Sequence, residues 1–214
     1  MMQQIVPVST QLFLFADKVV PLSSAFTAET LISYSQKKVK TNELAAYLLA
    51  FTLWNLFQKK FISLEIQPVK KMFFIPSGKL VVCIKKDIPV FGDLENWLIK
   101  GIERPNQDVK QLIHNLFDED QAWPHKMIIH KVSKEACESG FGKIRLSGSD
   151  NSVLRGFTGN IDFEANSVIV SELEDEFDLI VQQWNQFLAL SSKIAGMLIT
   201  LCRSALNSRV IQND

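Results

Sequence analysis

The sequence predicts a mostly α-helical fold with small β-hairpins, arranged as a winged-helix-like helical domain. Two observations support this prediction: an apolar helix beginning at Thr41 runs directly into strand-like segments, and helical periodicity then returns. The 214 residues are enough to bury a sizeable core, and we expect one domain over residues 1–214. Within it, residues 12–105 form a first helix-and-hairpin half, 106–170 a second helical half with a hairpin or loop, and 171–206 the C-terminal helices.

The first third of the chain contains three apolar or capped segments. Leu12–Phe15 is a short apolar run that fits either a buried strand or the start of a helix. Ser23 or Ser24 can cap a helix that runs to about Gln36. Thr41–Glu43 opens the strongest helix, because side-chain oxygens there can accept the first free backbone N–H groups. Its apolar residues cover more than one face, which is typical of a central core helix.

A change of period follows this helix. Phe61–Ile66, Met72–Ile75 and Leu80–Ile84 each have the composition of a strand, and residues 76–78 supply a turn between the last two. A helix followed by a β-hairpin is the winged-helix pattern. Asp93–Ile102 is then expected as a helix capped by its aspartate.

A second, weaker copy of the helix-and-hairpin pattern comes next. Asp108–Phe117 is amphipathic at helical spacing, and Pro124–Ser139 is a helix that begins with proline and ends at Gly140. Phe141–Leu146 is a short strand. The glycines that follow predict a loop or a loose hairpin; they are Gly148, Gly156 and Gly159.

Two helices are expected to complete the fold. Ser171 and Glu174 have the spacing of a capping box and predict a long helix to about Leu190. The last helix is expected over Ser192–Leu206. The longest uncharged apolar run, Leu44–Phe57, has 14 residues against the roughly 20 that cross a bilayer, so we expect no transmembrane helix. Met1–Thr10 has no basic residue and predicts no signal peptide.

Composition narrows the functional classes. Hydrophobic residues make up 47% and charged residues 21%, which excludes a disordered or fibrous chain. The 23 basic and 23 acidic residues balance, which argues against a dedicated nucleic-acid binder, and no nucleic acid is expected as a partner. Three isolated cysteines, Cys83, Cys137 and Cys202, predict neither a disulfide framework nor a thiolate metal site and fit a reducing compartment.

Charge is nevertheless unevenly distributed. Ten lysines lie between Lys37 and Lys86 against two acids, Glu43 and Glu65; they are Lys37, Lys38, Lys40, Lys59, Lys60, Lys70, Lys71, Lys79, Lys85 and Lys86. From Asp162 to Asp178 there are seven acids and no base. Such polarity can orient a protein on an anionic surface. The alternative is that the lysines lie on ordinary solvated faces.

The residues that could carry catalysis are few, and we expect no enzyme, cofactor or metal. His125 and His130 are five residues apart, whereas a helical metal pair needs a spacing of four. The pattern Gly-x-Ser-x-Gly is absent around Ser147–Ser149, and the acids of Asp118–Asp120 lie in an expected surface loop. Trp123 is the tryptophan we expect to be partly exposed, either as an anchor or packed on its neighbours.

Between residues 43 and 146 the chain carries an ordered series of motifs. They are Asn55–Glu65 (NLFQKKFISLE), the basic pair Lys70–Lys71 with Leu80–Lys85, then Lys85–Pro89 (KKDIP) with Gly92–Asp93, Val109–Leu116 (VKQLIHNL), Trp123–Pro124 and Ala136–Phe141 (ACESGF). In order and spacing this series resembles the Golgi phosphoprotein 3 family of peripheral Golgi membrane proteins.

The resemblance implies a fold and a function. The fold is mostly helical, and the function is binding of phosphatidylinositol 4-phosphate on the cytosolic face of the Golgi. The family serves as an adaptor that retains or sorts Golgi glycosyltransferases, so the implied partners are an anionic membrane surface and the cytosolic tails of membrane enzymes, with a homo-oligomer also allowed. The implied location is cytoplasmic, peripheral on the Golgi membrane.

Several positions depart from the family's pattern. Lys40 stands in place of the family's exposed tryptophan, and Leu49 and Ile129 replace arginines that hold the lipid headgroup. Lys126 and Lys131 replace two further arginines conservatively. Arginine grips phosphate with a bidentate fork that lysine cannot copy, so these changes alter the expected headgroup pocket.

The lysines are therefore the candidate lipid-binding residues. Those we assign to this role are Lys37, Lys38, Lys40, Lys59, Lys60, Lys126 and Lys131. A lysine close to an anionic membrane contributes on the order of 1 kcal/mol, so several on one face would give weak, reversible binding. The alternative is a winged-helix protein- or nucleic-acid-interaction module without a lipid ligand.

Overall fold

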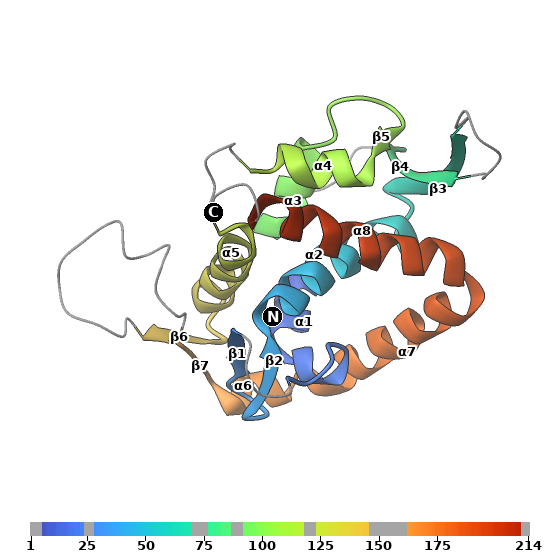
Figure 1. Cartoon of the computed structure of the whole chain (residues 1–214). Coiled ribbons are helices and arrows are strands. Elements are labelled where there is room, and N and C mark those ends of the chain that lie inside the picture. Colours follow the sequence, from blue (N-terminus) through green and yellow to red (C-terminus); the bar gives the residue numbers. More distant parts are fainter. Residues whose placement is uncertain are drawn as a thin grey trace.

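The computed structural model describes residues 6–23, 28–69, 77–86, 92–117, 123–145 and 162–210. This part of the chain contains eight α-helices and three small antiparallel sheets (Figure 1), so the predicted mostly helical fold with small hairpins is confirmed. The helices are α1 Val8–Leu14, α2 Thr41–Gln58, α3 Asp93–Lys100, α4 Val109–Asn115, α5 Pro124–Glu138, α6 Ser167–Ser171, α7 Glu174–Leu190 and α8 Ser192–Val210, with a 3-10 turn at Ala16–Lys18.

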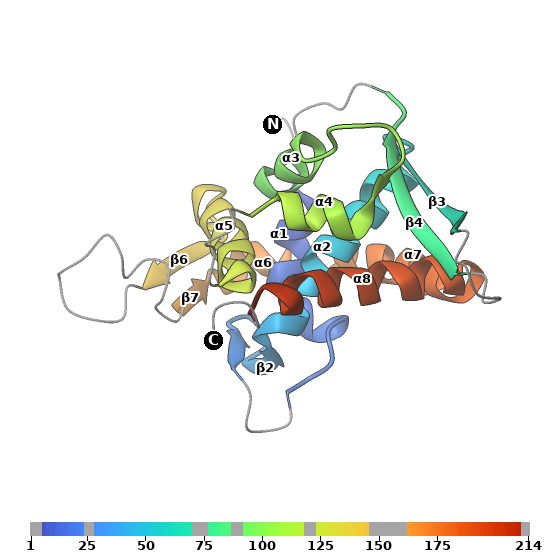
Figure 2. The same ribbon diagram turned by 45° about the horizontal axis from the view of Figure 1, so that its top comes forward.

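The strands form three separate sheets. Strand β1 (Glu29–Ile32) pairs with β2 (Lys37–Lys40), and β6 (Gly142–Arg145) pairs with β7 (Asp162–Ala165). The third sheet is three-stranded, with β4 (Ser77–Ile84) between β3 (Ile62–Val69) and the two-residue β5 (Gln107–Asp108). Both views place β2 and β3–β4 on opposite sides of helix α2, Thr41–Gln58 (Figures 1 and 2).

Helix α2 is the centre of the core. It is surrounded by α1, α5 and α8 (Figure 2), and its side chains are buried on all sides, as its apolar sequence predicts. Leu44, Leu49 and Trp54 are at most 1% exposed although they lie on different faces of the helix. Burying each large apolar side chain stabilises the fold by about 1.5–3 kcal/mol.

Aromatic rings attach α7 to the central helix. The ring of Trp184 lies 4.9 Å from that of Phe51 and 5.2 Å from that of Trp54, centroid to centroid. Helix α8 packs beside α2 and adds a two-bond contact, in which Nε and Nη2 of Arg203 each donate to Glu43 at 2.7 Å. These contacts hold the C-terminal helices α7 and α8 against the central helix α2.

The predicted helix from Ser23 or Ser24 to Gln36 is wrong. Residues 29–40 form the β1–β2 hairpin, and Gln36 closes its turn with a left-handed φ of 58°. Ile32 and Val39 are buried against the core while Lys37 and Lys38 are exposed, and pairing of the two strands fixes the segment as a hairpin. Leu12–Phe15, for which strand and helix were both open, lies largely in helix α1.

The first hairpin also differs from its prediction. Ser77 and Gly78 belong to β4 and do not form a turn; Gly78 pairs with Pro68 of β3. A Cβ on Gly78 would lie 2.5 Å from the Ile66 side chain, so glycine permits this close pairing. The predicted strand Met72–Ile75 lies outside the described residues.

Helix termini were predicted with mixed success. Asp108 caps α4, because its Oδ1 accepts the N–H of Gln111 at 3.1 Å, and Gly140 ends α5 with a φ of 81°. Asp93 is the first residue of α3 and not its cap, and its N–H donates to Glu135.

The capping box at the start of α7 is wrong. The Ser171 hydroxyl donates to the carbonyl of Val168 inside the unpredicted short helix α6, and α7 begins at Glu174 without a side-chain cap. The glycine-rich loop at 148–159 and the acids at 118–120 fall outside the described ranges.

No single helix in the described part of the chain is long and apolar enough to cross a membrane. Residues Glu174–Leu190 and Ser192–Ser208 reach that length and composition only as a pair, and the pair is bent by 108°.

Candidate functional site

The candidate lysines occupy three separate places. Lys37, Lys38 and Lys40 lie on β2, immediately before α2, whereas Lys59 and Lys60 follow its last turn. The 18 residues of α2 span roughly 27 Å at 1.5 Å per residue, so these two groups are at opposite ends of the central helix. The remaining two, Lys126 and Lys131, lie on α5.

Acidic partners neutralise much of the β2 group. The Nζ of Lys37 lies 3.0 Å from Asp17, and the Nζ of Lys38 lies 3.0 Å from Glu29. Lys40 is the residue before α2 and is only half exposed. This end of the molecule therefore presents little uncompensated positive charge.

The α5 lysines lie over aromatic rings. The Nζ of Lys126 is 5.1 Å from the ring centre of Trp123, which is 42% exposed as expected. The Nζ of Lys131 is 5.6 Å from the ring centre of Trp97 and 3.8 Å from Asp93. Cation–π contacts of this kind orient the ammonium groups, and Asp93 in addition compensates part of the charge of Lys131.

Two positions that depart from the family's pattern are in the core. Leu49 is 0% and Ile129 2% exposed, so neither position can present a side chain to a headgroup. The structure therefore gives a physical reason for apolar residues at both places.

The end of α2 has a specific backbone geometry. The N–H of Phe61 donates to the carbonyl of Leu56 at 3.0 Å, and the N–H of Lys60 donates to that of Phe57 at 2.9 Å. These two bonds form a Schellman motif, which places Lys60 in the left-handed region with a φ of 59°. Glycine is the usual residue there because a Cβ is unfavourable in this conformation.

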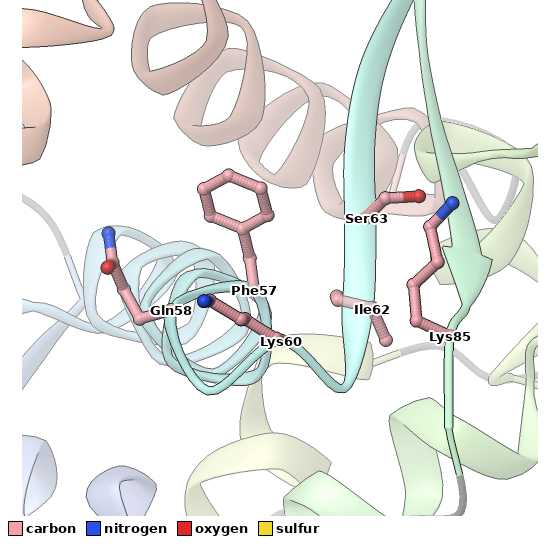
Figure 3. Close-up of a pocket in the computed structure, with 6 residues that line it drawn as sticks. All are labelled: Phe57, Gln58, Lys60, Ile62, Ser63 and Lys85. Carbon is pink, nitrogen blue, oxygen red and sulfur yellow. The ribbon is translucent and has the colours of Figure 1, made fainter.

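A surface pocket opens where α2 runs into β3. Its volume is about 420 Å³, and Figure 3 shows the side chains that line it: Phe57, Gln58, Lys60, Ile62, Ser63 and Lys85. Ser63 and Lys85 point to the same side, Lys60 and Gln58 lie at the helix end, and the apolar side chains lie between them (Figure 3). The pocket thus has an apolar middle with a cationic group on either side.

The polar groups of this pocket are largely uncommitted. Within the part of the chain that the structure describes, the side chains of Gln58, Lys60 and Ser63 make no hydrogen bond or ion pair. Lys85 has a long contact of 3.9 Å to Glu65, which is exposed and worth little in water. These donors are available to an external anion.

Exposed apolar and basic side chains adjoin the pocket. The ring of Phe57 lies 6.2 Å from that of Phe187 on α7, and Leu190, one helical turn further on, is 87% exposed. Lys86 is exposed, and its Nζ lies 4.6 Å over the ring of Phe61. We call these residues, with the pocket and Lys59, the basic edge.

Sequence reasoning found Lys59 and Lys60 but missed the other half of this site. Lys85 belongs to the basic stretch of the sequence, but nothing in the sequence near it indicates that it reaches the end of α2. Its position follows from strand register, since Ile62 pairs with Ile84 and the N–H of Lys85 donates to the carbonyl of Phe61 at 2.8 Å. The pairing of β3 with β4 places it in the lining of the same pocket as Lys60, on the other side of Ile62 (Figure 3).

The end of α5 repeats this geometry with different side chains. Phe141 N–H donates to Ala136 and Gly140 N–H to Cys137, at 2.9 and 3.0 Å, and Asn166 N–H donates to Phe141 at 2.8 Å. A second pocket of about 280 Å³ lies there, and its lining residues are Gly140, Gly142, Lys143, Glu164, Ala165 and Asn166. Its single lysine is balanced by one glutamate.

Buried carboxylates lie beside α5, away from the basic edge. Glu95 is 1% exposed and accepts the hydroxyl of Ser9 at 2.9 Å, and Glu135 accepts that of Thr10 at 2.9 Å. Burial raises the pKa of both groups, and the charge of Glu135 adds to the rise in the pKa of Glu95. The described residues contain no group of three His, Cys, Asp or Glu side chains that could hold a metal ion.

No protein-family model, curated protein or solved structure matches the chain. The resemblance to the Golgi phosphoprotein 3 family therefore stays a prediction from sequence motifs. The basic edge is the candidate site with the most available positive charge.

Proposed function

We propose that this protein is a peripheral membrane adaptor that binds anionic membranes through the basic edge. The observation that carries the proposal is the combination, at one end of α2, of exposed lysines with exposed apolar side chains. Lys60 and Lys86 supply the charge, and Leu190 supplies an apolar side chain that can enter the interfacial region of a bilayer.

The distribution of ion pairs among the lysines favours the C-terminal end of α2 as the membrane-binding site. Lys37 and Lys38 are paired with acids at 3.0 Å, whereas Lys60 has no such partner among the described residues. A membrane attracts uncompensated charge within roughly 8–10 Å at physiological salt. The lysines of β2 and α5 can add long-range attraction, while contact is made at the basic edge.

The ordered series of sequence motifs between residues 43 and 146 supports a more specific proposal for the membrane and the partners. We extend the proposal to a divergent relative of the Golgi phosphoprotein 3 family, with a winged-helix-like arrangement of α2 and β3–β4. In that setting the membrane is the cytosolic face of the Golgi with its phosphatidylinositol 4-phosphate, and the clients are cytosolic tails of glycosyltransferases. The basic edge then replaces the headgroup contacts that Leu49 and Ile129 cannot make.

Co-sedimentation with vesicles tests the proposal. Wild-type protein is expected to bind vesicles containing phosphatidylinositol 4-phosphate at physiological salt, and the variant Lys59→Glu/Lys60→Glu is expected to lose that binding. Lys134→Glu/Lys143→Glu is the matched control, because it makes the same change in net charge at exposed positions of α5 and β6, on the other side of the molecule. Failure of the wild-type protein to bind any anionic vesicle would contradict the proposal.

A helix followed by a β-hairpin also favours the alternative of a winged-helix interaction module. Duplex DNA added as a competitor separates the two functions. Duplex DNA and free phosphoinositide are compared as competitors at equal concentrations of phosphate groups. If DNA displaces the protein from vesicles at the lower concentration, the interaction module is the better description.

A further inference from the structure

From the geometry of the β3–β4 sheet, we infer that the outer edge of β3 is a docking site for an extended acidic peptide, which adds to the sheet as a further strand. The backbone of the peptide pairs with Ile62, Leu64 and Ile66, and one of its apolar side chains enters the pocket beside Phe57. In this mode of recognition, main-chain hydrogen bonds give affinity and side-chain pockets give specificity. The inference deepens the proposed adaptor function by naming where a partner segment binds, and its test uses no membrane, so that either can fail alone.

The backbone of β3 is paired on one side only. Strand β3 is the end strand of its sheet, and β4 is its neighbour. The N–H of Lys85 donates to the carbonyl of Phe61 at 2.8 Å, so Phe61 and every second residue after it face β4 with their backbone groups. The residues between them, Ile62, Leu64 and Ile66, therefore point their N–H and C=O groups away from β4. Within the described ranges, no strand pairs with that side of β3.

This free edge is neither kinked nor interrupted between Ile62 and Ile66. Strand β3 has eight residues in continuous register with β4 and contains no bulge, whereas a strand usually has about five to six residues. Pro68 occupies the next outward position, where no N–H is needed for the pairing with β4, and it ends the row of free donors. A straight edge with unpaired N–H and C=O groups is a template for another strand.

The surroundings of the edge determine which peptide fits. The pocket of about 420 Å³ lies between the start of β3 and the end of α2, and Phe57 and Ile62 form its apolar middle (Figure 3). Lys60 and Lys85 lie on opposite sides of that middle, so an apolar side chain with acidic residues beside it matches the pocket (Figure 3). Symmetric pairing of two copies of the chain at this edge would instead bring the lysines of both copies together, which like-charge repulsion disfavours.

Hydrogen exchange of the whole, ¹⁵N-labelled protein tests the inference directly. In the protein alone, the amides of Leu64 and Ile66 should exchange faster than those of Ser63 and Glu65, which face β4. A short capped peptide of alternating valine and glutamate, added without vesicles, should slow exchange at Leu64 and Ile66 by about tenfold or more. The same peptide methylated at every backbone nitrogen cannot donate to β3 and should have no effect. A peptide of alternating valine and lysine should also fail to protect these amides.

Two substitutions at one residue separate the contribution of the backbone from that of the side chain. Ile66→Pro removes an outward N–H and leaves the bonds to β4 intact, as Pro68 does two residues later, whereas Ile66→Ala shortens the side chain and keeps the N–H. With both variants folded by circular dichroism, Ile66→Pro should bind the peptide about fivefold more weakly than Ile66→Ala, the equivalent of about 1 kcal/mol for one hydrogen bond.

The outcomes distinguish this inference from the membrane function. Unchanged exchange at Leu64 and Ile66, or equal slowing by the methylated peptide, would overturn the docking site. Slow exchange at both amides without peptide, together with a dimer in sedimentation equilibrium, would show that a second copy occupies the edge and would also overturn it. Protection by the peptide without binding to any anionic vesicle would support the docking site and contradict the membrane function. Vesicle binding without protection would overturn the docking site and leave the membrane function standing.

Discussion

Two helix ends in this molecule are built alike and differ in charge. Helices α2 and α5 both end in a Schellman motif that is followed by a phenylalanine and a pair of antiparallel strands. In both, the N–H of the residue directly after the second strand (Lys85 or Asn166) donates to the carbonyl of that phenylalanine at 2.8 Å. The left-handed residue is Lys60 in the first junction and Gly140 in the second. The pocket beside the first is lined by two lysines, and that beside the second by one lysine and one glutamate.

The difference between Lys60 and Gly140 distinguishes the residues that these junctions require for folding from those available for binding. Backbone hydrogen bonds close both helix ends equally well, so the geometry requires no charged side chain. The second junction has the residue that best fits the backbone, whereas the first has a lysine at the same position. We therefore assign the lysine to recognition and the glycine to stability.

The largest expected effect concerns the phenylalanine that follows each helix. Phe141 is 6% exposed, so Phe141→Ala should lower the free energy of unfolding by about 3 kcal/mol. Phe61 is only half buried, and Phe61→Ala should cost roughly 1–2 kcal/mol. Urea denaturation of both variants measures the difference. Equal losses would mean that the two junctions contribute alike to the core.

The next largest effect concerns the first residue of the strand that follows each helix, Gly142 in β6 and Ile62 in β3. A Cβ on Gly142 would overlap the carbonyl oxygen of Glu164 and lie 2.5 Å from the Phe163 ring, so Gly142→Ala should cost about 1–3 kcal/mol. The equivalent residue of the first junction is Ile62, which is buried, and Ile62→Val should cost only about 1 kcal/mol. Thermal unfolding monitored by circular dichroism checks both. A neutral Gly142→Ala would show that this strand pair has room to separate.

Exchanging the two residues with left-handed φ should change the free energy of unfolding in opposite directions. Gly140→Lys should lower the free energy of unfolding by about 1 kcal/mol, because a side chain disfavours a φ of 81° although nothing lies within 4 Å of the new Cβ. Lys60→Gly should leave stability unchanged or raise it by up to about 1 kcal/mol. Urea midpoints of the two variants test this. A destabilised Lys60→Gly would mean that the lysine is retained for folding.

The smallest effect is a pH dependence confined to the α5 side. Burial raises the pKa of Glu95 above its ordinary 4.5, so the folded protein binds more protons than the unfolded chain between 4.5 and the raised pKa. Stability from this group therefore falls as pH rises through that window. Glu95→Gln should stabilise the protein more at pH 7.5 than at pH 4.5, as measured by urea denaturation. An equal gain at both pH values would contradict the raised pKa.

Patterns within one segment predicted the fold well. The all-round apolar sequence of α2, Pro124 at the start of α5 and Gly140 at its end each gave a correct helix or terminus. The β1–β2 hairpin could not be recognised in this way, because each strand has only four residues and only one fully buried side chain, Ile32 on β1 and Val39 on β2, so neither strand shows an alternating pattern. Ser171 and Glu174 have the spacing of a capping box, but the Ser171 hydroxyl donates a hydrogen bond to Val168 within α6.

The candidate site was only half visible for the same reason. Lys59 and Lys60 are adjacent to a strong helix and were assigned from sequence. Lys85 joins them through the register of β3 with β4, and Leu190 through the packing of α7 on α2, and neither contact is local in the chain. Conversely, Lys37 and Lys38 are close to Lys59 and Lys60 in composition and charge, but the length of α2 separates the two pairs in space.

Moving one lysine between the two junctions tests the central claim most directly. The variant Lys60→Gly/Gly140→Lys keeps the net charge and transfers the ammonium group from the end of α2 to the end of α5. Co-sedimentation with phosphatidylinositol 4-phosphate vesicles at physiological salt is the measurement. If the junction of α2 with β3–β4 is the binding site, the wild-type protein sediments and the exchanged variant, folded by circular dichroism, binds about fivefold more weakly, the equivalent of about 1 kcal/mol for one lysine. Equal sedimentation of the two proteins would contradict the assignment of binding to the basic edge.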